Sequence, residues 1–322
     1  MDFNLTDLQI AWQAKAHALG KTLGQDASAA EVIRAAAASG LVASRPDLLA
    51  ATVAVEALAF ESSAAAITLA LHTGVAAGLD GDGRFAAVGR GDTVGAIALS
   101  SDEVPTDVAG RLTGRAAWVA PLTTEGIAIV GMRSASGLTA VAVALDAPEV
   151  VVEPIDTAAL GGLVCGHLRF DHAPCVALGA TMPFMGRVRI LLTAAGLGMG
   201  RRALHEALMA ARGHIGRGAG GEQTVQGLLA DAATELDAAM LLTWKAATAP
   251  VLSLADASMA KLAATEATQR AVARATQVVG ADSFRRGHTV ERLAQDARAL
   301  ELFAGRTEAL REAVAMEALP RT

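Results

Sequence analysis

The chain has 322 residues, of which 52% are apolar and 19% charged, and its net charge is −6. It is long enough for two or three packed subdomains and too apolar to be disordered. Its 27 Lys and Arg residues are scattered and form no basic stripe, so nucleic acid is excluded as an expected partner. Aromatic residues make up only 3% and tyrosine is absent, so an interior of Ala, Leu and Val is expected, which favours close-packed helices.

Secretion and membrane insertion are both disfavoured by the sequence. Cys165 and Cys175 are too few for a disulfide framework, and the first residues lack the pattern of a signal peptide. Residues 62–79 carry no formal charge and approach the length of a membrane span, but Ala, Ser, Thr and Gly dominate them. We therefore expect a buried helix there, no membrane attachment and a cytoplasmic location.

The first ninety residues show the signals of helices. Thr6 to Gln9 and Ser28 to Glu31 have the spacing of capping boxes, which predicts helices beginning near residues 7 and 29, the second ending by Gly40. A third helical segment is predicted from about residue 46 to residue 79, with one break.

From residue 92 the pattern changes to short apolar runs separated by Gly, Pro and Asp, which predicts an antiparallel sheet or a small barrel. The predicted strands are residues 94–99, 115–120, 126–130, 138–145, 150–152 and 163–170.

Helical periodicity returns after Pro183. A single apolar stripe predicts one helix, formed by Val225, Leu228, Leu229, Ala232, Leu236, Met240 and Trp244. A second helix is predicted from residue 259 to 279, ended by Gly280, and a last one from about residue 290 to 316. The expected domains are residues 1–91 (helical), 92–178 (β) and 179–322 (helical bundle).

Short segments spread over nearly the whole chain resemble those of one enzyme family. In the first half they are residues 3–9 (FNLTDLQ), 95–100 (GAIALS), 114–120 (GRAAWVA) and 170–171 (FD). In the second half they are residues 195–200 (AGLGMG), 212–216 (RGHIG), 223–231 (QTVQGLLAD), 259–262 (MAKL), 277–280 (QVVG), 291–298 (ERLAQDAR) and 302–308 (LFAGRTE).

These segments, in this order, resemble the acyl-CoA dehydrogenases. The resemblance implies an α+β fold with an N-terminal helical domain, a middle antiparallel β domain and a C-terminal four-helix bundle. It also implies FAD as cofactor and the α,β-desaturation of an acyl-CoA thioester. In that reaction a carboxylate removes the α proton while hydride leaves the β carbon for the flavin.

Both positions at which the family places its catalytic carboxylate lack an acid here. The resemblance assigns the common position to Ala304 and the rarer one, on the Gly-rich helix, to Val188. Neither side chain can accept a proton. Glu301 and Glu308 flank Ala304, so a relocated base is one alternative and two solvated surface carboxylates are the other.

The residues that would hold FAD within one subunit are partly lost. The resemblance assigns Ser100 and Trp118 to the flavin, but Ala120 replaces a family hydroxyl and Ala116 a family Lys. The structural alternative for Trp118 is a core residue of the sheet.

Residues that the family extends to a neighbouring subunit's flavin are better kept. The resemblance assigns Arg212 to the pyrophosphate and Gln277 and Gly280 to the adenosine half. Ile215, Ala281 and Ser283 depart from the family pattern there. Arg212 capping a helix or pairing with a carboxylate, and Gln277 as an interface amide, are the structural alternatives.

We therefore expect a subunit that completes a homologous partner's flavin site and relies on that partner for the base. The segment of residues 81–91 is shorter than in full-length members. The resemblance associates such pruning with unlike subunits acting on bulky, steroid-type thioesters. A stand-alone enzyme with changed chemistry and a cofactor-free scaffold remain alternatives. His167 and His172 lie near the two cysteines, but their spacing does not match a zinc site.

Overall fold

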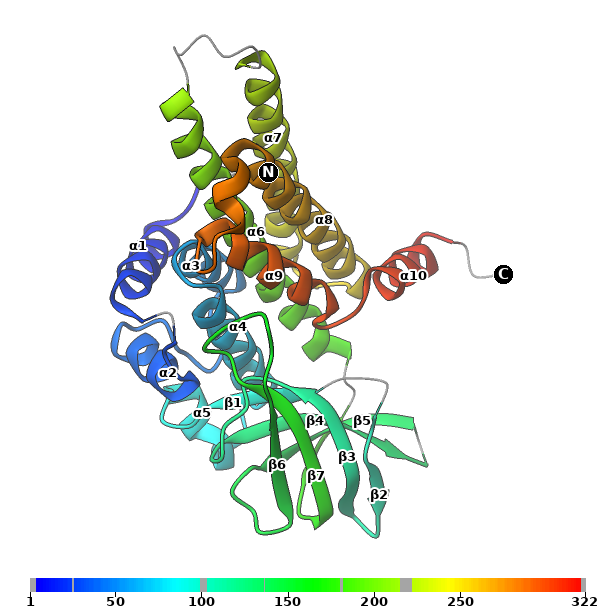
Figure 1. Ribbon diagram of the computed structural model, residues 1–322. Coiled ribbons are helices and arrows are strands. Elements are labelled where there is room, and N and C mark those ends of the chain that lie inside the picture. The colour runs from blue at the N-terminus through cyan, green and yellow to red at the C-terminus, as the bar shows by residue number, and fades with distance from the viewer. Residues whose placement is uncertain are drawn as a thin grey trace.

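The computed structural model describes residues 4–24, 26–98, 103–135, 137–179, 182–214 and 222–319. Helices form one part of the molecule and a twisted sheet the other (Figure 1). The long helix α6 (Met182–His214) starts beside the sheet and runs through the helical part.

The N-terminal helices begin where the capping signals predict. Helix α1 (Asp7–Thr22) and helix α2 (Ala29–Ala38) both open with a complete capping box. Helices α3 (Leu48–Glu61) and α4 (Ser63–Gly78) are one segment broken at Ser62, whose hydroxyl accepts from the Ala65 N–H. A short 3-10 turn η1 (Gly83–Phe85) and helix α5 (Ala86–Arg90) lead to the sheet.

The expectation of a buried helix rather than a membrane span is confirmed for α4. Every residue from Ser63 to Ala76 is buried, which an Ala-rich helix packed on all sides allows. Within the described ranges, no helix is both long and apolar enough to cross a membrane.

The capping box of α2 gives a direct stability prediction. Replacing Ser28 with Ala removes the acceptor for the Glu31 N–H and the hydroxyl bound to the Glu31 carboxylate. We expect a loss of about 1 kcal/mol of unfolding free energy, because a helix-start donor is left without its partner. Urea unfolding measures it, and an unchanged midpoint would contradict the assignment.

Within the described residues, eight strands form one sheet in the order β6-β7-β3-β2-β4-β5-β8, and β1, which lies off this path, pairs with β4. The strands are β1 (Gly95–Ala98), β2 (Thr106–Val108), β3 (Arg111–Val119), β4 (Ile127–Ser134), β5 (Gly137–Ala144), β6 (Val150–Ile155), β7 (Cys165–Ala173) and β8 (Val176–Gly179). The sequence did not predict β2 and β8. The expectation of a purely antiparallel sheet also needs correction, because β1 and β2 both pair with β4 in parallel.

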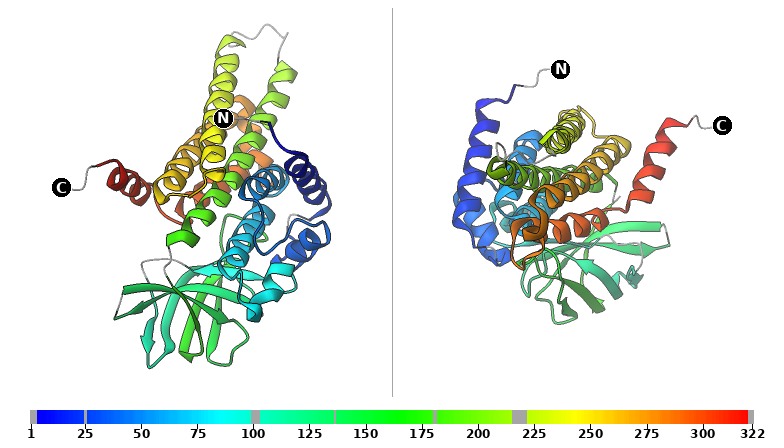
Figure 2. Two further views of the ribbon diagram at one scale, coloured as in Figure 1. Left: turned by 180° about the vertical axis from the view of Figure 1, so that it is seen from behind. Right: turned by 45° about the horizontal axis from the view of Figure 1, so that its top comes forward.

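The C-terminal half contains α6, α7 (Glu222–Ala247), α8 (Leu254–Val279), the 3-10 turn η2 (Gly280–Phe284), α9 (Thr289–Leu302) and α10 (Thr307–Ala318). The last predicted helix is therefore two helices. Helix α9 ends at Leu302, Phe303 is extended, and the chain then turns through Ala304 and Gly305, which have φ of 56° and 121°. Helix α10 extends from the body and packs mainly on α8 (Figure 2).

One large core joins the N-terminal helices, α6, α8, α9 and one face of the sheet. A second core fills the other face, where the sheet curls around side chains such as Leu168 and Phe170. The sheet and the helices therefore pack against each other through one continuous core.

Candidate functional site

The turn between α9 and α10 carries the first of the two positions expected for a base. Ala304 adopts the left-handed conformation, which is uncommon for a residue with a side chain and occurs most often at functional sites and caps. Its methyl group is partly exposed and offers no proton acceptor.

Two buried cationic side chains, Arg189 and Lys261, bind the backbone carbonyls of this turn. Arg189 on α6 donates from Nε to the Ala304 carbonyl at 2.9 Å and from Nη1 to the Ser258 hydroxyl at 2.7 Å. Lys261 on α8 is 1% exposed, and its Nζ lies 3.2–3.5 Å from three carbonyl oxygens. Those carbonyls belong to Leu300, Glu301 and Gly305, so the ammonium satisfies free acceptors at the end of α9.

Burial strongly affects the charge of this lysine. Desolvation, with a smaller contribution from repulsion by Arg189, lowers the pKa of Lys261 to about 7, while the charge of Glu301 acts in the opposite direction. The sequence motif contained Lys261 but did not reveal this role. The available signal was a lysine on the same face of the helix as Ala257 and Ala264, where apolar residues are expected.

The second base position is closed by packing. Val188 is fully buried on α6, and an added Cβ at Gly74 of α4 would lie 2.6 Å from a Val188 methyl carbon. One turn further, a Cβ at Gly78 would lie 2.6 Å from the Phe184 ring. Helices α4 and α6 are therefore in contact here, with no space beside Val188 for a reacting group.

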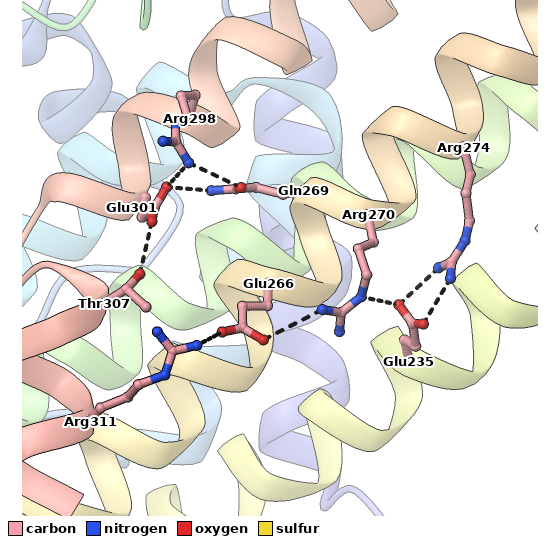
Figure 3. Close-up of polar contacts among 9 residues, drawn as sticks. All are labelled: Glu235, Glu266, Gln269, Arg270, Arg274, Arg298, Glu301, Thr307 and Arg311. Atoms are coloured by element: carbon pink, nitrogen blue, oxygen red, sulfur yellow. Dashed lines mark hydrogen bonds and ion pairs between the residues drawn. The ribbon is translucent and has the colours of Figure 1, made fainter.

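Glu301 is held in a network that does not suit a base. Its carboxylate accepts from Gln269 Nε2 at 2.7 Å and from the Thr307 hydroxyl at 2.8 Å, and it pairs with Arg298 (Figure 3). Burial acts to raise the pKa of Glu301, but these hydrogen bonds and the charges of Arg298 and Lys261 outweigh it and lower that pKa. Glu301 is thus a structural link between α8, α9 and α10, whereas Glu308 is exposed.

A second polar chain runs beside this network across α7, α8 and α10. Arg311 pairs with Glu266, Glu266 with Arg270, and Glu235 with both Arg270 and Arg274 (Figure 3). Hydrogen bonds led by that from Arg274 lower the pKa of Glu235 to about 2. This ladder ties the helices together at the surface and encloses no cavity.

Trp118 does not belong to the sheet core. Its side chain is 55% exposed and its φ is 55°, at an irregularity of the β3–β7 pairing between Ala116 and Val119. The interpretation of Trp118 as a core residue is therefore wrong, because the bulge turns it out of the strand's alternation. Ser100, the other residue expected at this end, lies outside the described residues.

The residues expected to contact a partner's flavin lie elsewhere. Arg212 is exposed near the end of α6, and within the described ranges its only recorded polar contact is the Met209 sulfur, 3.8 Å from Nη1. Gln277 is exposed in the last turn of α8. Gly280 ends α8 with φ 73°, and an added Cβ there would meet open space.

These positions fall into two groups that one chain does not bring together. The C-terminal ends of α6 and α8 point away from the sheet, whereas Trp118 lies in β3 (Figure 1). An exposed indole and an open, arginine-flanked helix end each fit part of a flavin dinucleotide. At Ala120 a methyl group replaces the hydroxyl that the resemblance expects beside the flavin ring.

A cavity of about 320 Å³ lies apart from all of these positions, between the α3–α4 break and the start of α9. Its lining mixes arginines such as Arg202 and Arg292 with acids such as Glu61 and Asp296, and it includes no predicted site residue. The mixed charges give no preference for one ligand class. Among the described residues, no group of three His, Cys, Asp or Glu side chains is arranged to hold a metal.

Two curated relatives align with this chain. The 3-sulfinopropanoyl-CoA desulfinase of Paraburkholderia xenovorans is 37% identical over 32% of this chain and 27% of its own length. The human short-chain specific acyl-CoA dehydrogenase is 28% identical over 70% of this chain and 63% of its own length. The chain thus aligns with between about a quarter and two thirds of the length of these relatives.

Solved structures share the fold over nearly the whole chain. A structure of the electron transferring flavoprotein of Acidaminococcus fermentans covers 100% of both chains, with a TM-score of 0.89 and 20% identity. Butyryl-CoA dehydrogenase from Megasphaera elsdenii covers 99% of this chain and 100% of its own, with a TM-score of 0.88 and 22% identity. An FAD complex of PigA covers 99% of both chains, with a TM-score of 0.83 and 17% identity.

The family description "Acyl-CoA dehydrogenase, C-terminal domain" matches residues 178–319, which run from β8 to the end of α10. This match, the curated relatives and the shared fold agree with the segments that first suggested the resemblance. Residues 178–319 thus match the acyl-CoA dehydrogenase family, and the chain as a whole shares the fold of butyryl-CoA dehydrogenase.

Proposed function

We propose that this chain is a subunit of an FAD-dependent acyl-CoA dehydrogenase that acts with a homologous partner, and that the partner supplies the catalytic carboxylate. The observation that carries the proposal is the absence of an acid at both base positions. Ala304 carries only a methyl group at the first position. Val188, at the second position, lies on α6 and is buried against α4.

The other residues around Ala304 also support a catalytic carboxylate supplied by the partner. Arg189 and Lys261 keep the turn at Ala304 in a fixed backbone shape, and Glu301 is engaged with three partners and is a poor proton acceptor. A stand-alone enzyme with a base relocated to Glu301 is therefore disfavoured.

Cofactor contacts are proposed to be shared between subunits. Arg212, Gln277 and Gly280 would contact the adenosine and phosphate half of a flavin held mainly by the partner. Trp118, with Ser100, would flank an isoalloxazine on this chain's own sheet. When bound, the flavin supplies the acceptor for the hydride lost from the substrate's β carbon.

The substrate is proposed to be an acyl-CoA thioester, of a bulky, steroid-type acid. The segment between α4 and β1 contains only the η1 turn and the five-residue α5. In the proposed site this segment forms one wall of the acyl cavity, so that wall is small. A smaller wall gives a larger acyl group more room at a shared site.

Coexpression with a full-length homologue that carries the catalytic carboxylate tests the proposal. The expected product is a yellow complex bleached by an acyl-CoA, whereas this chain alone is colourless. Replacing the partner's base with Gln should lower the rate by about 10²–10⁴-fold, the usual range for a lost general base.

Glu301→Gln and Glu308→Gln in this chain are the matched controls, and we expect each to leave the rate within about threefold. If this chain alone bound FAD and reduced it with a thioester, the proposal that the partner supplies the base would be wrong. A colourless complex without acyl-CoA affinity would instead indicate a scaffold.

A further inference from the structure

We propose that His167 is a positioning residue that holds Trp118 outward, in the orientation that receives the planar ring of a flavin. This inference rests on the proposed function for its ligand. The contact between the two residues stands on the geometry of this chain alone.

The Trp118 backbone needs support from its surroundings. A bulky residue at φ 55° is in a conformation that side chains disfavour, and it persists only where neighbouring contacts fix it. Burial does not provide that support, because the side chain is 55% exposed. Residues held in such strained conformations cluster at binding and active sites.

His167 contacts Trp118 at two points. The Trp118 backbone N–H donates to His167 Nδ1 at 3.4 Å, which assigns the ring proton of a neutral imidazole to Nε2. The two rings also meet edge to face, with centroids 6.0 Å apart and planes inclined at 70°. One histidine therefore restrains both the bulged peptide and the indole.

The backbone of His167 is itself fixed. It pairs with Glu153 of β6, and its neighbours Gly166 and Leu168 are buried. An added Cβ at Gly166 would lie 2.4 Å from the Glu153 carbonyl oxygen, so β6 and β7 approach as closely as their backbones allow. The imidazole therefore projects from a closely packed pair of strands, which fixes its position beside the bulge.

The consequence concerns the flavin side of the site. Without the imidazole, the indole is free to fold onto the sheet or rotate, and a planar ligand must then order it on binding. With His167 in place, the stacking surface exists before the ligand arrives, which favours binding through preorganisation.

A single-tryptophan variant tests the contact directly. In the Trp12→Phe, Trp244→Phe background, Trp118 is the sole emitter, and we expect His167→Ala to lower its fluorescence anisotropy and raise acrylamide quenching at least twofold. His167→Asn keeps an acceptor near the Nδ1 position and should restore most of the difference. His172→Ala, an exposed histidine on the same strand, is the control and should change neither readout.

The same variants in the complex with its partner test the role toward flavin. His167→Ala should weaken FAD affinity at least fivefold. His167→Asn should recover part of that affinity, and His172→Ala should leave it unchanged. Unchanged Trp118 quenching in His167→Ala would overturn the contact. Altered quenching with unchanged FAD affinity would overturn the role in flavin binding. If no complex binds FAD at all, the proposed function fails, while the fluorescence result still decides whether His167 holds Trp118.

Discussion

Replacing Gly198 with alanine is expected to destabilise the protein by about 3 kcal/mol. Gly198 lies in the middle of α6, where the added Cβ would come within 2.2 Å of the Glu56 carbonyl oxygen and 2.6 Å of the Ala59 Cβ. Both atoms belong to α3 and cannot rotate away, so the two helices must separate and disturb the packing around them. Urea unfolding of the purified chain measures the loss.

Gly227→Ala is the matched control. Gly227 is an exposed residue of α7, and an added Cβ would meet no atom within 4 Å. The substitution should raise the unfolding free energy by about 0.5–1 kcal/mol, because alanine is the better helix former. Equal effects at the two positions would mean that α3 and α6 do not touch at Gly198.

The second large effect expected is a dependence of stability on pH that originates at Lys261. Because its folded pKa of about 7 lies below that of an unfolded lysine, the unfolded chain binds more protons between the two values. Stability from this group therefore rises with pH, by about 2 kcal/mol between pH 7 and pH 9 at 1.36 kcal/mol per pKa unit.

Unfolding of the Lys261→Met variant over the same pH range isolates this contribution. Subtracting its curve from that of the unmodified chain should give the rise with pH. Lys245→Met, which removes a lysine with a side chain 52% exposed, serves as the comparison and should leave the rise in place. A Lys261→Met protein with the original pH dependence would assign it to other groups.

Much of the helical fold could be predicted because its signals are local. The capping hydroxyls at Thr6 and Ser28 and the break near Ser62 lie in the segments that they organise. The division of the last helix was not predictable in this way, since the left-handed turn at Ala304 is held by Arg189 and Lys261 from two other helices. The strands β2 and β8, of three and four residues, are too short for their alternation to stand out.

The site was predictable in its residue types and not in its contacts. The missing acids at Ala304 and Val188 follow from the family segments, but the closure of the space beside Val188 depends on a glycine in α4, more than a hundred residues earlier. Likewise, Glu301 accepts from Gln269 of α8, which lies 32 residues earlier, so the flanking sequence does not reveal this contact. Trp118 was misjudged because a bulge reverses the face that strand alternation predicts.

Helix α10 is attached to the body mainly by surface contacts, whereas buried side chains hold the turn before it. Leu310 is its one buried residue, and Arg311 and Thr307 reach α8 and α9 at the surface. Ions in solution weaken exposed pairs of this kind and hardly affect contacts made by Lys261 in the interior. The attachment of α10 to the body is therefore expected to weaken as ionic strength rises, while the turn at Ala304 keeps its shape.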